Sequence, residues 1–285
     1  MKKKIFFLVF AIGGVLLLAG LFQWTGQDRQ NQSASLEQAT EEGSQAGIYS
    51  FYKDDDLDRL SNAKEVIYSS SLNVPDTDGD GYSDSEEVEN GYDPIVAGSA
   101  KLRDRTYLSA TLQYFLWLQE EKDIKNPEIE TELVNEFSEK YPETIAIKYI
   151  DKKEIKLLSQ DDKEAIRNYL AETNKISLPE GIISYQEIAQ GYSRENMPIL
   201  EDILGKIELA YLDFSYLQAP PSAEKIQQGY LTIVREFSNI FSDLRFFQED
   251  PVRIELNLKK AQKLIELSEE IEKQKLELIK KYEIS

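Results

Sequence analysis

The chain has 285 residues and a formal net charge of −19 at pH 7, and it contains no cysteine and no histidine. The missing side chains exclude Ser-His-Asp triads, cysteine nucleophiles and nearly all zinc sites. The negative charge argues against DNA or RNA as a partner, because nothing would neutralise the phosphates, and it favours divalent cations.

The N-terminus has the pattern of a membrane signal anchor. Three lysines at positions 2–4 precede an apolar run over residues 5–22, which is long enough for a membrane-spanning helix. Positive charge before such a run places the following chain outside the membrane. We therefore expect a transmembrane helix over residues 1–24 and a single-pass cell-membrane protein whose C-terminal bulk is extracytoplasmic. A cleaved signal peptide, which would give a secreted protein, is the alternative.

Two short regions are expected between this anchor and the main domain. Residues 25–47 are rich in Gln, Ser, Glu, Ala and Gly without an apolar period, which predicts a flexible linker. Residues 48–99 contain the aspartate-rich sequence DTDGDG at positions 76–81 and are therefore expected to form a calcium-binding module. An acid run, Asp54-Asp55-Asp56, lies near the start of this module. We interpret it as a solvated surface run, with a second calcium site as the alternative.

The segment Asp76 to Glu87 carries the clearest chemistry. Acidic residues stand at positions 1, 3, 5, 9 and 12 of this segment and Gly81 stands at position 6, which is the ligand spacing of an EF-hand calcium loop. Ca²⁺ is a hard cation that binds carboxylate and carbonyl oxygens. The predicted ligands are the carboxylates of Asp76, Asp78, Asp80, Asp84 and Glu87 and the backbone carbonyl of Tyr82. An acidic surface turn without an ion is the alternative.

The residues around this loop modify the EF-hand interpretation. Pro75 directly precedes the loop and disfavours an entering helix. Residues 76–94, DTDGDGYSDSEEVENGYDP, resemble the bacterial calcium loops of the thrombospondin type 3 repeat class, with Gly-Tyr-Asp-Pro in place of the usual Gly-Thr-Asp-Pro. The resemblance implies an extracytoplasmic calcium-binding element and no enzymatic activity.

Residues 100–285 are expected to form a mainly α domain. Apolar residues over 107–119 predict a buried core helix that is too short to span a membrane. Alternating apolar residues over 144–150 predict a short strand, paired with 154–158 or 175–178. The expected fold therefore includes a small β element near 144–158.

The last third of the chain is expected to be a three-helix antiparallel bundle over residues 198–285. Apolar residues recur in steps of three and four along three long segments, which is the period of helices with one buried face. Pro220-Pro221 and Asp250-Pro251 separate these segments. Short turns between long helices make neighbouring helices antiparallel.

Together these patterns predict a membrane-anchored, extracytoplasmic calcium-binding protein of the bacterial cell envelope. Ca²⁺ would act as a structural clamp beside a helical protein-interaction domain, whose partner is another envelope protein or a second copy of the chain. No enzymatic activity is expected. The alternatives are an envelope hydrolase that uses paired carboxylates and a structural component of a surface or secretion assembly.

Overall fold

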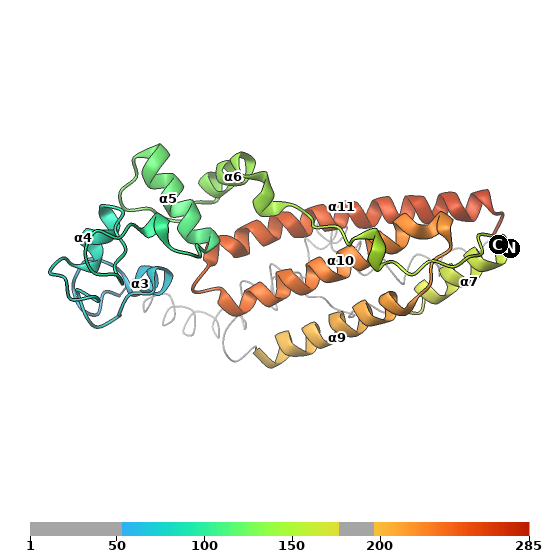
Figure 1. The fold of residues 1–285 in the computed structure, drawn as a ribbon, viewed down its shortest axis with the longest axis horizontal. Coiled ribbons are helices and arrows are strands. Elements are labelled where there is room, and N and C mark those ends of the chain that lie inside the picture. The colour runs from blue at the N-terminus through green and yellow to red at the C-terminus, as the bar shows by residue number, and fades with distance from the viewer. Residues whose placement is uncertain (1–52, 177–196, 285) are drawn as a thin grey trace, which may run out of the picture. The chain divides into compact units, whose positions relative to one another are not determined.

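The computed structural model describes residues 53–176 and 197–284. These residues form two compact units. Residues 53–144 and 246–256 make up the loop unit, and residues 145–176, 197–245 and 257–284 make up the bundle unit. The described residues contain eight α-helices and no strand (Figure 1), so the prediction of a mainly helical protein is confirmed.

The loop unit contains four short helices. They are α3 (Asn62–Tyr68), α4 (Asp84–Glu89), α5 (Ala110–Lys122) and α6 (Thr131–Lys140), with a 3-10 turn η2 (Leu102–Asp104) before α5. The free N–H groups at the start of α5 are satisfied by side chains. The Ser109 hydroxyl accepts from the Leu112 amide at 3.2 Å, and the Asp250 carboxylate accepts from the Thr111 amide at 2.8 Å. Such capping bonds stabilise a helix by about 1 kcal/mol.

Helix α5 is the core of the loop unit. Tyr114 and Phe115 are almost fully buried on it, which confirms the predicted core helix. Tyr68 of α3 packs against Phe115 with ring centroids 6.0 Å apart. Phe137 of α6 packs edge-on against Tyr114 at 5.7 Å. Aromatic pairs in this geometry add about 0.5–1.5 kcal/mol each beyond the area they bury.

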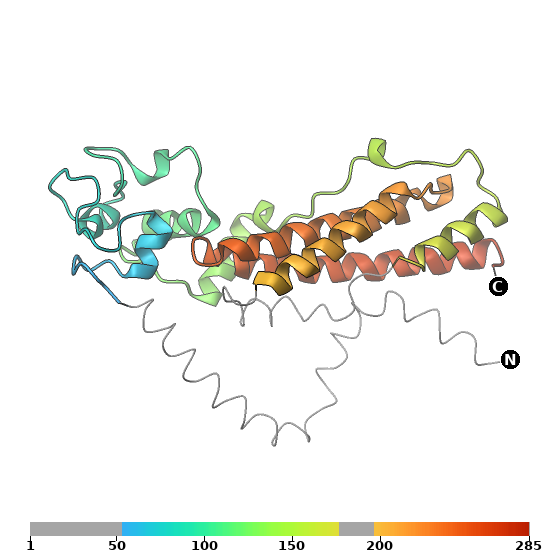
Figure 2. The ribbon, with the colours of Figure 1, turned by 90° about the horizontal axis from the view of Figure 1, so that it is seen from below.

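The bundle unit is built from long helices. It contains α7 (Lys163–Thr173), α9 (Met197–Tyr216), α10 (Glu224–Asp243) and the part of α11 (Pro251–Lys281) that follows Leu256. Short 3-10 turns also occur: η3 (Pro142–Ile145), η4 (Lys152–Glu154), η6 (Pro221–Ala223) and η7 (Leu244–Phe246). Figure 2 shows α9, α10 and α11 side by side in a second view.

Contacts along α10 establish the antiparallel arrangement of the bundle. Phe214 of α9 stacks on Tyr230 of α10 with ring centroids 4.8 Å apart. On the other side, the hydroxyls of Ser222, which precedes α10, and Tyr282 lie 3.1 Å apart. Further along α10, Glu236 forms an ion pair with Lys260 of α11. Later residues of α10 therefore contact earlier residues of α11, which means that the two helices are antiparallel. The predicted helical bundle is confirmed.

The predicted β element near 144–158 is wrong: these residues contain no strand. Side chains of α10 bind the backbone groups that a partner strand would have used. Thr232 accepts from the Ile150 amide at 3.1 Å, and Gln228 donates to the Ile150 carbonyl at 2.7 Å. The isolated parallel bridge in this region joins Leu157 to Ala219, which was not a predicted partner. The residues with alternating apolar side chains therefore form an extended segment bound to α10 rather than a strand of a sheet.

The predicted localisation also needs correction. Across residues 53–176 and 197–284, no helix is both long and apolar enough to cross a membrane. This finding contradicts the prediction of a single-pass membrane protein. The apolar run that motivated it, and the predicted anchor (1–24) and linker (25–47), lie outside the described residues.

Gly229 allows α10 and α11 to approach closely, which gives a stability test. A Cβ on Gly229 would overlap Ile271, with its Cγ1 atom only 2.7 Å away. Gly229→Ala should therefore lower the free energy of unfolding by about 1 kcal/mol, because overpacking outweighs the better helix propensity of alanine. Chemical denaturation measures the change.

The matched control is Gly205→Ala on α9, where no atom lies within 4 Å of an added Cβ. This change should stabilise the protein by about 0.5–1 kcal/mol. Equal effects of the two substitutions would contradict the close approach of α10 and α11.

Candidate metal centre

The acidic loop at residues 76–83 leads directly into α4. Ser83 is the N-cap of this helix, and its hydroxyl accepts from the Glu86 amide at 3.3 Å. The Glu86 carboxylate accepts in return from the Ser83 amide at 3.2 Å. This reciprocal capping box fixes where the helix begins. It thereby places Glu87 in the first turn of α4, at the end of the acidic loop.

Asp76 organises the backbone of the loop. Its carboxylate accepts from the Gly79 amide at 2.8 Å and from the Gly81 amide at 2.9 Å. Both glycines have positive φ, +77° and +101°, and an added Cβ at either would meet no atom within 4 Å. Conformation rather than space therefore calls for glycine at these two positions.

The loop brings three carboxylates to one point. Asp76, Asp78 and Asp80 each offer an oxygen, and these oxygens lie within 4.8 Å of one another. Carboxylate oxygens converging in this way can hold a metal ion.

Two buried oxygens, one in this group and one in Glu87, have no hydrogen-bond partner in the part of the chain that the structure describes. Glu87 is only 4% exposed, and its Oε2 has no hydrogen-bond partner among the described residues. Burial, followed by the charges of Asp78 and Asp80, raises the pKa of Glu87 from 4.5 to about 7. Asp78 has a similar buried, unpartnered Oδ2, and burial raises the pKa of this carboxyl too. A cation would satisfy these oxygens, so the residues present fit a metal ion.

The remaining predicted ligands are placed differently. Asp84 is fully buried, but both of its oxygens accept from Thr77, at 2.8 Å from the amide and 2.6 Å from the hydroxyl. The structure therefore does not bring the Asp84 carboxylate into the group of three. The predicted ligand at Tyr82 is its backbone carbonyl. Its side chain is not needed for packing, because the residue is 64% exposed.

The segment after α4 folds back on the loop through contacts that the sequence did not indicate. The Gly98 amide donates to Asp80 at 2.8 Å. Asp93 is buried and accepts two bonds from the Arg105 guanidinium, at 2.7 and 2.6 Å. Arg105 also donates to the Tyr68 carbonyl of α3 at 2.8 Å. The Asp93–Arg105 pair therefore connects the end of the acidic segment to α3.

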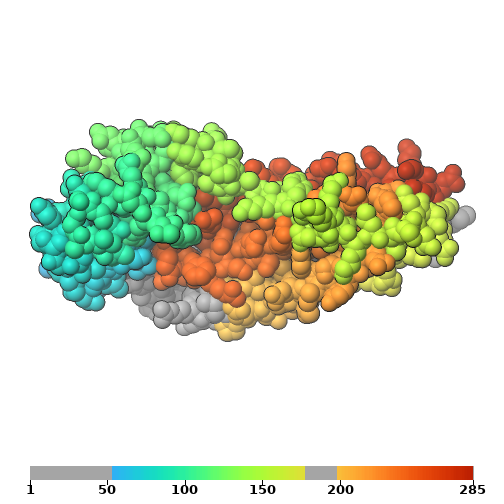
Figure 3. All heavy atoms as spheres, viewed as in Figure 1, coloured from blue at the N-terminus to red at the C-terminus, as the bar shows by residue number. Residues whose placement is uncertain are grey.

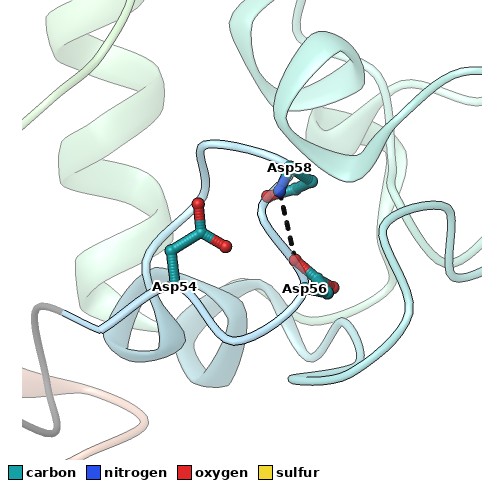
Figure 4. Close-up of side chains that lie close together, drawn as sticks. All are labelled: Asp54, Asp56 and Asp58. Atoms are coloured by element: carbon teal, nitrogen blue, oxygen red, sulfur yellow. Dashed lines mark hydrogen bonds between the residues drawn. The ribbon is translucent and has the colours of Figure 1, made fainter.

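A second group of carboxylates lies outside this segment. Oxygens of Asp54, Asp56 and Asp58 also lie within 4.8 Å of one another (Figure 4). The sequence interpretation favoured a solvated run and kept a metal site as the alternative. The sequence does contain one indication of this group. Its aspartates alternate in the same way as Asp76, Asp78 and Asp80.

Comparison with known proteins gives one match. The family model of the bacterial TSP3 repeat matches residues 76–97, and the predicted resemblance of this segment to the thrombospondin type 3 repeat class is confirmed. No curated protein and no solved structure matches the chain. The match covers a small part of the 285 residues, and it coincides with the loop that carries Asp76, Asp78 and Asp80.

The raised pKa of Glu87 predicts a pH-dependent stability when divalent ions are chelated. The folded protein holds this proton up to a pH of about 7, whereas an ordinary glutamate loses it near 4.5. The stability contributed by the protonated form is therefore complete below about pH 4.5 and is lost as the pH rises to about 7. Thermal unfolding in chelator at several pH values measures this loss.

Glu87→Gln should make the decline with pH shallower, because glutamine does not titrate. The control is Glu89→Gln, which changes an exposed carboxylate of the same helix and should leave the slope as in the wild type. A slope that Glu87→Gln leaves unaltered would show that Glu87 titrates normally.

Proposed function

We propose that residues 76–97 bind Ca²⁺ as a structural clamp, meaning an ion that holds the acidic loop against α4. The observation that carries the proposal is the convergence of three aspartates beside the buried Glu87, whose Oε2 has no hydrogen-bond partner among the described residues. The bacterial TSP3 repeat match over the same residues supports it. Calcium is the favoured ion because it accepts six to eight oxygens in flexible geometry, whereas Mg²⁺ demands a nearly ideal octahedron.

The ligand set of the proposed site is the one that the loop spacing predicts. Asp76, Asp78, Asp80 and Glu87 would bind through carboxylates and Tyr82 through its backbone carbonyl. Asp84 would bind through a water, because both of its oxygens already accept from Thr77. The bound ion supplies positive charge that offsets the mutual repulsion of these carboxylates, and no catalytic step is assigned to it.

The clamp would act on the packing of the loop unit through α4. Gln119 of α5 donates to the Val88 carbonyl of α4 at 3.0 Å, so α4 is connected to the core helix. Glu87 adjoins Val88 and would also bind the ion. Without the ion, buried like charges disfavour the folded loop, and the contact between α4 and α5 loosens.

Asp78→Asn tests this proposal, because the Asp78 Oδ2 has no hydrogen bond to lose among the described residues. Isothermal titration of the full chain with Ca²⁺ should show affinity at this site weakened about tenfold or more, since one charged ligand is lost. Calcium at about 100 times Kd should stabilise the wild type by about 2.7 kcal/mol, and the variant by less.

The control for this experiment is Glu89→Gln, which should bind Ca²⁺ as the wild type does. Calcium binding that Asp78→Asn leaves undiminished would contradict the proposed site.

We propose further that the bundle unit provides a protein-interaction surface through which copies of the chain associate. Helix α9 lies at the surface in Figure 3. Three apolar side chains at spacings of three and four residues, Leu209, Leu212 and Tyr216, are exposed by 63%, 46% and 71%. Residues at this spacing share one helix face. An exposed apolar face of this kind is typical of an interaction site.

Sedimentation of the full chain tests this surface. The combined change of Leu209, Leu212 and Tyr216 to serine should shift the protein toward monomer, because the buried apolar area is lost. Leu276→Ser changes an exposed apolar residue of α11 and is the control that should leave association intact. A wild type that is monomeric throughout would contradict self-association.

A further inference from the structure

The acidic group at Asp54, Asp56 and Asp58 has the same local geometry as the loop at Asp76. Asp54 accepts from the amides three and five residues later, Leu57 at 2.7 Å and Arg59 at 2.9 Å. Asp76 accepts from the amides three and five residues later in the same way. Residues 54–65 therefore repeat the backbone hydrogen-bond pattern of residues 76–87.

The backbone conformations match as well. Leu57 and Arg59 have φ of +66° and +83°, and they stand where Gly79 and Gly81 have φ of +77° and +101°. A left-handed conformation is uncommon for residues other than glycine. Its cost, about 1–3 kcal/mol for each residue, persists only where the surroundings impose it. The sequence hides this loop because leucine and arginine replace the glycines.

Glu65 provides an independent observation that points to a ligand. It follows Asp54 by the same interval at which Glu87 follows Asp76, and it lies in the first turn of α3. Its exposed fraction is 0%, and neither carboxylate oxygen has a hydrogen-bond partner in the described part of the chain. Besides burial, the charges of Asp56 and Asp58 raise the pKa of Glu65, so this carboxylate lies beside the group.

A solvated acid run does not explain these positions. Asp58 is 8% exposed and Glu65 is fully buried, and Asp56 also has a buried Oδ2 without a partner among the described residues. A protonated Glu65 would still need an acceptor for its proton. Leaving a buried polar atom unpaired costs about 1–3 kcal/mol. A bound cation would satisfy several such oxygens at once.

We propose that Asp54, Asp56, Asp58 and Glu65 form a second calcium site. The backbone carbonyl of Leu60, at the position equivalent to Tyr82, would complete it. Asn62, at the equivalent of Asp84, does not contribute, because its side chain bonds Asp55 in both directions, at 3.1 and 2.8 Å. A water takes its place. This site lies outside the segment that matches the bacterial TSP3 repeat.

The two sites are adjacent in the loop unit. The Ser85 amide of α4 donates to Asp58 at 2.9 Å, so a ligand of the second site caps the helix that carries Glu87. After burial and the charges of the nearer loop aspartates, the charge of Asp84 also raises the pKa of both Glu65 and Glu87, so this buried carboxylate lies near both. An ion in either loop therefore reduces the excess negative charge around the other, and we expect the two ions to bind with positive cooperativity.

Native mass spectrometry of the full chain, titrated with Ca²⁺ after chelation, tests the second site. The wild type should bind two ions. Glu65→Gln should bind one, with the affinity for the lost ion reduced tenfold or more, because glutamine supplies one neutral oxygen in place of a carboxylate. Asp55→Asn is the matched control in the same acid run. Because Asp55 is paired with Lys53, this substitution should leave both ions bound.

The outcomes separate this site from the one at Asp78. One ion in the wild type that is lost in Asp78→Asn but retained in Glu65→Gln overturns the second site alone. No ion in the wild type overturns both sites. Thermal unfolding in chelator shows that Glu65→Gln folds, because removing an unpartnered buried carboxylate should leave the midpoint equal or higher. Its calcium-induced rise in midpoint should be smaller than that of the wild type.

Discussion

The loop unit depends on how buried carboxylates are compensated. Glu65 and Glu87 are almost fully buried, and each lies among aspartates that raise its pKa. Two like charges 4 Å apart repel by about 1 kcal/mol in water and by about 4 kcal/mol at an effective dielectric of 20. Protons or cations would offset this repulsion, so we expect the stability of this unit to depend on pH and on divalent ions.

The helices that carry these glutamates connect the acidic loops to the core. Tyr68 at the end of α3 packs on Phe115, and Val88 of α4 accepts from Gln119, so both helices lie against α5. Arg105 joins α3 to the buried Asp93. Both acidic loops are therefore connected to the packed interior of the loop unit through α3 and α4.

The bundle unit is stabilised by different means. Its helices bury apolar seams, and a buried polar network links three of them. Gln227 accepts from the Tyr169 hydroxyl at 2.9 Å and donates to the Phe214 carbonyl, which connects α7, α9 and α10 without a buried charge. Satisfied networks of this kind fix a particular arrangement of helices. We therefore expect the stability of this unit to respond much less to calcium.

The sequence by itself determined the long helices, the turn at Pro220 and the acidic loop at Asp76, because each depends on the spacing of nearby residues. The tertiary structure decided which groups the backbone bonds to and which side chains are buried. Side chains of α10 bind the backbone at Ile150, so the strand predicted from alternation does not form. Packing of α3 buries Glu65 beside Asp56 and Asp58. The sequence did not indicate this loop, because Arg59 stands at the position of a glycine. The burial of these carboxylates arises from packing between segments that are distant in the sequence, and local periodicity carries no record of it.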